Sequence, residues 1–141
     1  QCLCHIRRTW VAATPEEQVR QQLLCWMMES LGYPRGHLAV EQSLKDLPHL
    51  ANSPLTIPTR RADILCYAKG RLSSLQPLLL VECKAIPITD AVIRQVVGYN
   101  QFVQAPYIVL ANAQEVRTGR WNDTISQYEF LAGLPKYQTI A

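Results

Sequence analysis

The chain has 141 residues, of which 48% are hydrophobic and 18% charged. This size and composition are those of one ordered domain with a sizeable core, and they argue against a disordered segment. The longest apolar runs are too short to span a membrane, and the N-terminus lacks the apolar stretch of a secretory signal peptide. The net charge of +3 is compatible with nucleic-acid binding but is weak evidence for it.

The five cysteines predict a reducing compartment rather than a disulfide framework. Cys66 and Cys83 lie in apolar strand patterns and Cys25 in a helix pattern, so we expect reduced, buried thiols in a cytoplasmic protein. The Cys2-Leu3-Cys4-His5 segment offers three metal ligands, but its spacing matches no zinc module. The missing initial methionine suggests a trimmed chain or a fragment.

The first regular element is expected to be a helix that begins after Thr14. Thr14 is a good N-cap, Pro15 suits the first turn, and Glu17 is placed to complete a capping box. An apolar stripe at helical spacing follows. Its members are Val19, Leu23, Trp26, Met27 and Leu31. Gly32 is then expected to end the helix, because glycine readily adopts the left-handed conformation of helix ends.

The rest of the chain alternates strand and helix patterns. Strands are expected over residues 38–44, 60–67, 77–83, 106–111 and 116–121. Residues 45–58 contain three prolines and predict a loop, and residues 69–71 predict a turn. Thr89 is expected to cap a helix over 90–103, and a last helical piece is expected near 128–134. This order predicts an α/β fold bordering on α+β, with a mixed sheet of about five strands flanked by helices.

Polar residues interrupt the second and third strands. Asp63 lies inside one apolar strand, and Glu82 and Lys84 end the next. Residues two apart share a face of a strand, so Glu82 and Lys84 point the same way and Cys83 points into the opposite layer. The third strand is apolar on both faces before this point, so we expect it to be central, with the second strand beside it.

This pattern predicts a metal-dependent phosphodiesterase site. Buried carboxylates are costly without partners, and Mg²⁺ typically takes one or two carboxylates together with waters and substrate phosphate. Asp63 and Glu82 are the expected metal ligands, with the backbone carbonyl of Cys83 as a further candidate. Lys84 would orient or help deprotonate the attacking water and stabilise charge on phosphorus.

Gln95 and Tyr99 lie four residues apart and therefore share one face of the following helix. They are expected either to contact the substrate backbone or to hold Lys84 in place. The alternative is that both are ordinary residues of an amphipathic helix. Likewise, a Glu-x-Lys triplet by itself indicates no more than a salt bridge at a strand end.

For four other charged residues, the sequence leaves open both a structural role and a role in the site. Arg60 and Arg61 are either salt-bridge partners of Asp63 or substrate-binding residues. Glu17 either reaches the metal from the first helix or only caps that helix. Glu41, on the first strand, is either structural or a substrate contact.

Taken together, four segments resemble the PD-(D/E)xK nuclease superfamily, and most closely the N-terminal nuclease domain of type I restriction enzyme R (HsdR) subunits. These segments are residues 60–64, 79–85, 95–100 and 105–112. The resemblance covers roughly residues 14–120. It implies a restriction-endonuclease-like core over residues 14–141, preceded by an N-terminal extension over 1–13, and Mg²⁺-dependent hydrolysis of DNA, with Mn²⁺ able to substitute.

The resemblance also assigns roles to individual residues. Asp63 and Glu82 would be metal ligands and Lys84 the catalytic lysine. Gln95 and Tyr99 would form the accessory motif of the RecB-like branch, and Glu17 would be a possible first-helix acid.

Three departures from the family pattern matter. Ala62 stands where the superfamily has proline, and Asn112-Ala113 stands where an Asn-Gly turn is expected. The chain has no G-x-x-x-x-G-K-[ST] phosphate loop, so we expect no nucleotide cofactor and no translocation by this chain alone.

The chain would then be an excised domain or a stand-alone nuclease of DNA repair or processing. Expected partners are DNA, a helicase or translocase, specificity subunits, or a second copy of the chain. The other open functions are a catalytically inactive DNA- or protein-binding domain and an RNA or tRNA nuclease on the same scaffold.

Overall fold

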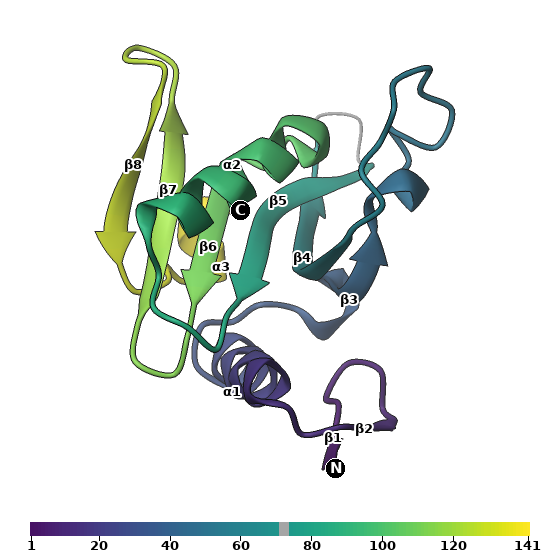
Figure 1. The fold of residues 1–141 in the computed structure, drawn as a ribbon, viewed down its shortest axis with the longest axis vertical. Helices are drawn as coiled ribbons and strands as arrows, with labels where there is room; N and C mark the ends of the chain where they lie inside the picture. The colour runs from purple at the N-terminus through teal and green to yellow at the C-terminus, as the bar shows by residue number, and fades with distance from the viewer. Residues whose placement is uncertain (71–73) are drawn as a thin grey trace.

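The computed structural model describes residues 1–70 and 74–141, and Figure 1 shows their arrangement. A short N-terminal hairpin precedes a six-stranded sheet and its helices. The helices are α1 (Pro15–Glu29), α2 (Asp90–Val103) and α3 (Tyr137–Ile140). The strands are β1 (Cys2–Leu3), β2 (Trp10–Val11), β3 (Leu38–Ser43), β4 (Arg61–Lys69), β5 (Leu75–Cys83), β6 (Tyr107–Ala111), β7 (Val116–Asn122) and β8 (Gln127–Ala132). Two 3₁₀ turns, Arg35–His37 and Leu44–Asp46, flank β3.

The sheet is mixed, with strand order β3-β4-β5-β6-β7-β8. All neighbours are antiparallel except β5 and β6, which are parallel and joined through α2. The α/β class is confirmed, and so is the central position of β5 beside β4. The expected number of about five strands was one too low, because the last segment adds β8 at the edge of the sheet.

The helix expected near residues 128–134 is wrong. This segment instead forms β8, which pairs with β7 in the register Trp121 to Tyr128 and Gly119 to Phe130. Aromatic residues favour a strand where a neighbouring strand offers ladder hydrogen bonds and a surface to pack on. The ring of Tyr128 meets that of Trp121 edge-on at 5.1 Å between centroids. The last helix, α3, begins only at Tyr137.

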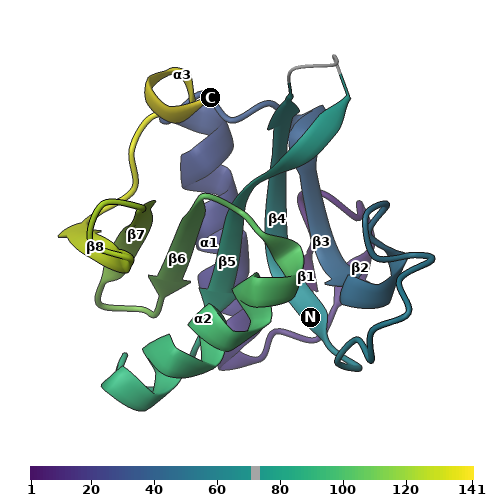
Figure 2. The same cartoon turned by 90° about the horizontal axis from the view of Figure 1, so that it is seen from above.

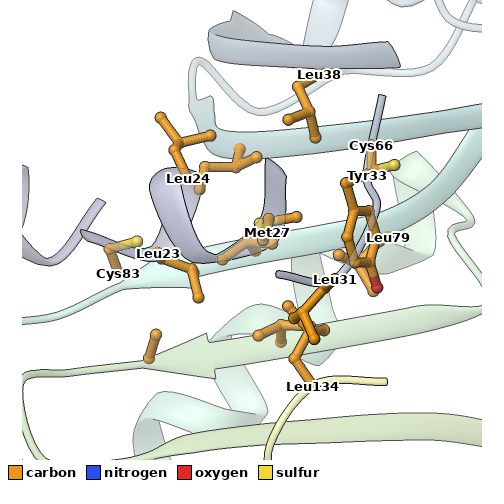
Figure 3. Close-up of a cluster of buried hydrophobic side chains, with 14 of the residues drawn as sticks. Leu23, Leu24, Met27, Leu31, Tyr33, Leu38, Cys66, Leu79, Cys83 and Leu134 are labelled. Atoms are coloured by element: carbon orange, nitrogen blue, oxygen red, sulfur yellow. The ribbon is translucent and has the colours of Figure 1, made fainter. Parts of the chain in front are cut away.

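The helices cover opposite faces of the sheet, α1 on one side and α2 on the other (Figure 2). On the first face, Leu24 and Met27 of α1 pack with Leu79 of β5 (Figure 3). On the second face, Val96 of α2 packs with Leu80 of β5. The central strand is therefore buried on both sides, and this holds its C-terminal end in a fixed position between the two helices.

Both predicted helix caps are present. The Thr14 hydroxyl accepts a hydrogen bond from the Glu17 amide at 3.1 Å, and Thr89 does the same for Val92 at 3.3 Å. Gly32 follows α1 with a positive φ of 76°. The Glu17 side chain, however, bonds to other side chains rather than completing a capping box on Thr14.

Several boundaries and burials differ from expectation. Trp26 was placed on the apolar stripe of α1, but its side chain is 38% exposed. Cys25 is only half-buried, whereas Cys66 and Cys83 are buried, and all five cysteines are free thiols. In the predicted turn over 69–71, Lys69 is the last residue of β4, and Arg71 lies outside the described residues.

Candidate active site

The candidate site forms where β4 and β5 separate. Their antiparallel ladder runs to the pair Ile64 and Val81. Beyond this pair, the Asp63 carboxylate accepts a hydrogen bond from the Cys83 amide at 2.7 Å. The side chain thus binds a backbone N–H at the point where the strands separate, and this fixes the acid against the end of β5.

Glu82 is the second acid of the site and is only 5% exposed. Its Oε1 accepts a hydrogen bond from Arg60 Nη2 at 3.1 Å and forms a salt bridge with Lys84 Nζ at 3.4 Å. Burial raises the pKa of Glu82 to about 7, and the charge of Asp63 adds to the rise, while Lys84 and Arg60 oppose it. Burial is therefore the main reason that Glu82 resists ionisation, and a further cation beside it would favour the charged form.

The pKa of Asp63 is raised as well. Burial raises the pKa of Asp63 against the lowering effects of the Cys83 amide and the Arg20 guanidinium. Two neighbouring carboxylates that each resist ionisation are common at functional sites, although structural ion-pair networks produce similar shifts.

Arg20 of α1 completes the surroundings of Asp63 and was missed in the sequence. Its Nη2 donates to Asp63 Oδ1 at 3.1 Å and also to Glu41, and its Nη1 donates to Glu17 at 3.2 Å. One signal was available: Arg20 lies four residues before Leu24 and seven before Met27, on the buried stripe of the helix. A charged residue on such a stripe requires buried partners.

Glu17 is tied into the same network. Its Oε1 accepts from Arg7 at 2.8 Å as well as from Arg20, and its Oε2 accepts from Gln21 at 2.8 Å. Both oxygens of Glu17 are therefore engaged by protein donors.

Arg60 and the helix α2 form the other side of the site. The Arg60 guanidinium lies 3.9 Å from the centre of the Tyr99 ring, a cation–π arrangement. The Tyr99 hydroxyl is buried and has no hydrogen-bond partner within residues 1–70 and 74–141, and burial raises its pKa. Gln95 is exposed one turn before Tyr99. Arg61, in contrast, is 69% exposed, and its nearest acid is Glu41 at 4.0 Å.

The structure thus brings together Asp63, Glu82 and Lys84, with Arg60 and Tyr99 alongside. Within the described residues there is no group of three or more His, Cys, Asp or Glu side chains that could hold a metal ion. Two convergent carboxylates beside a buried hydroxyl that lacks a partner nevertheless fit Mg²⁺, which takes few protein ligands and keeps waters. The role of the Cys83 carbonyl as a ligand stays a prediction.

One comparison with known proteins identifies the family of the chain. Residues 15–135 match the family model described as "Type I restriction enzyme R protein N terminus (HSDR_N)". No curated protein and no solved structure gives a significant match to the chain. No helix in the described part of the chain is long and apolar enough to cross a membrane.

Proposed function

Because the chain belongs to the family of type I restriction enzyme R protein N-terminal domains, we propose that it is a Mg²⁺-dependent deoxyribonuclease domain of the PD-(D/E)xK type. One observation carries the proposal. Asp63 and Glu82, both with raised pKa values, meet Lys84 at the point where β4 and β5 separate. Mn²⁺ is expected to replace Mg²⁺, since both are hard cations that accept oxygen ligands.

Asp63 and Glu82 would hold the metal, with the Cys83 carbonyl as the backbone candidate. The bound ion would supply Lewis-acid stabilisation of the phosphate and a more acidic water. Asp63 is already held in place by the Cys83 amide. Burial disfavours the charged form of Glu82, so a bound cation would lower its pKa and keep it ionised near neutral pH.

Lys84 would act on the attacking water and on the charge that develops on phosphorus. Its ammonium group lies 3.4 Å from Glu82 and is partly exposed, so it faces both the acid and solvent. A positioned ammonium group stabilises such charge best where surrounding protein lowers the local dielectric. No covalent intermediate is required.

Arg60, Tyr99 and Gln95 would contact the DNA strand beside the metal. Arg60 stacks on Tyr99 and bonds to Glu82, so it lies between the acid and α2. Arg61 is exposed next to it and adds positive charge for phosphate. We further propose that the domain works in the cytoplasm with a translocase and with specificity subunits, since the chain has no phosphate loop of its own.

The test is nicking of supercoiled plasmid in Mg²⁺ or Mn²⁺, compared with EDTA. We expect Lys84→Ala and Asp63→Ala each to lower the rate about 10²-fold or more, as the loss of a charge-stabilising group does elsewhere. Lys136→Ala, an exposed lysine outside the site, is the matched control and should cut at the wild-type rate.

Two outcomes contradict the proposal. If the wild-type chain nicks no form of DNA with either metal, it is not a deoxyribonuclease, and DNA retention in a gel shift would then indicate a binding domain. If it nicks DNA and Lys84→Ala nicks equally well, the site is wrong. Digestion of single-stranded, duplex and branched DNA and of RNA in parallel identifies the preferred substrate.

A further inference from the structure

Arg20 lies where carboxylates from three different elements converge. Glu17 comes from α1, Glu41 from β3 and Asp63 from β4, and all three accept hydrogen bonds from the Arg20 guanidinium. Arg20 is only 5% exposed, and its Nε has no hydrogen-bond partner within the described residues. This buried cation touches one of the two proposed metal ligands directly.

Glu41 and Asp63 face each other across neighbouring strands. The register of β3 and β4 pairs Val40 with Ile64 and Gln42 with Ala62, which places Glu41 opposite Asp63. Like charges in directly opposite positions destabilise a sheet. The same Arg20 nitrogen, Nη2, donates to both carboxylates and so bridges them.

The backbone at Glu41 is unusual as well. Its φ of +57° lies in the left-handed region, although the residue is inside a strand and is not glycine. Such conformations cost free energy and persist where the surrounding structure imposes them, often at functional sites. Here the kink accompanies a Glu41 carboxylate that is bonded to Arg20.

We propose that Arg20 is a positioning residue that fills the place a second divalent cation would take between Glu41 and Asp63, so that the site binds one metal ion. This inference rests on the proposed metal site at Asp63 and Glu82. The Arg20 guanidinium satisfies Oδ1 of Asp63, and the Cys83 amide satisfies Oδ2. Each carboxylate oxygen keeps a second lone pair, so Asp63 stays able to bind the ion that it shares with Glu82.

A purely structural salt bridge would make the same contacts, but it would not set the number of bound cations. Without Arg20, the oxygens of Glu41 and Asp63 would lose the cation that bridges them, whereas Glu17 would keep its pair with Arg7. Carboxylate oxygens gathered in this way are ligands that divalent cations favour. The number of ions per chain therefore separates a positioning role from a structural one.

The experiment counts Mn²⁺ bound per chain at pH 8, by electron paramagnetic resonance of the free ion and by titration calorimetry. The variants are Arg20→Met, which removes the charge, and Arg20→Lys, which keeps it. Arg61→Met is the matched control, because Arg61 also faces Glu41 but is exposed and contacts neither Asp63 nor Glu17 within salt-bridge distance. Circular dichroism verifies that each variant is folded.

We expect one Mn²⁺ per chain for the wild type, Arg20→Lys and Arg61→Met, and two for Arg20→Met. Two ions in the wild type, or one in folded Arg20→Met, overturn the inference while leaving the proposed metal site intact. No bound ion in the wild type instead overturns the proposed function itself. Should Arg20→Met not fold, Arg20→Gln takes its place, because glutamine is also uncharged but keeps a hydrogen-bond donor, and the expected count is again two.

Discussion

Among the single residues, Glu82 shows most clearly how the site acts against the stability of the fold. Its carboxylate is buried at the end of the central strand, with Asp63 close enough to raise its pKa further. Arg60 and Lys84 offset only part of this effect. In the metal-free protein, ionised Glu82 should therefore lower the free energy of unfolding.

The first prediction concerns Glu82→Gln in the absence of metal. The pKa of Glu82 is raised from 4.5 in the unfolded chain to about 7 in the folded one. Between these values the folded state binds more protons, so its stability falls as pH rises from about 4.5 to 7. A neutral glutamine removes this loss. We expect Glu82→Gln to be more stable than wild type at pH 8 by about 2–3 kcal/mol, and to differ little at pH 4.5, as measured by urea unfolding in EDTA.

Glu16→Gln is the control for this prediction, since Glu16 is exposed on the first turn of α1. Its effect should stay within about 0.5 kcal/mol at both pH values. A Glu82→Gln variant that is less stable than wild type at pH 8 would mean that the ion pairs with Arg60 and Lys84 outweigh the burial of the acid.

Some residues of the site could be predicted from the sequence, and others could not. The convergence of Asp63, Glu82 and Lys84 followed from two-residue periodicity and the expectation that their strands are neighbours, and the structure has this arrangement. The contact between Arg20 and Asp63 depends on how α1 crosses the sheet, which no local pattern encodes. The kink at Glu41 is also a tertiary effect, because nothing in its neighbours in the sequence requires a positive φ.

At the scale of elements, local sequence signals predicted most helix and strand boundaries but failed at the C-terminal edge of the sheet. The helix α2 begins and ends where its cap and periodicity predicted, at Asp90 and Val103. The segment that forms β8 was misjudged because its strand character depends on β7. Phe130 packs its ring over Gly119 of the neighbouring strand, and this contact joins residues eleven apart in the chain.

The second prediction tests this contact through Gly119→Ala. An added Cβ at Gly119 would lie 2.7 Å from Cε1 of Phe130, so the ring must shift away from β7. Overpacking of this kind costs about 1–2 kcal/mol of unfolding free energy. Gly36→Ala is the control, because a Cβ at Gly36 meets nothing within 4 Å, and it should be close to neutral. Denaturant unfolding of both variants measures the difference.

A double variant isolates the cause of the Gly119→Ala effect. In a Phe130→Ala background the clash is gone, so Gly119→Ala should cost much less than it does alone. An equal cost in both backgrounds would show that the loss comes from the backbone of β7 rather than from the ring.

For the whole molecule, both faces of the sheet and the N-terminal segment converge on one strand end. Arg20 reaches Asp63 from α1 on one face, and Arg60 stacks on Tyr99 of α2 on the other. Arg7 of the N-terminal segment pairs with Glu17, the acid that also holds Arg20. The residues before the family match are therefore linked to the site by a chain of ion pairs.

The last prediction follows from the number of sites per molecule. Each chain carries one set of Asp63, Glu82 and Lys84, and one such set acts on one phosphodiester at a time. On supercoiled plasmid, we therefore expect open circle to accumulate first and to pass through a maximum, while linear DNA appears after a lag from independent second nicks. The initial nicking rate should rise in proportion to protein concentration. A gel time course at several protein concentrations, with Lys84→Ala as the inactive control, measures both. Linear DNA formed from the start, at the rate of open circle, would instead mean that two chains cut the two strands together.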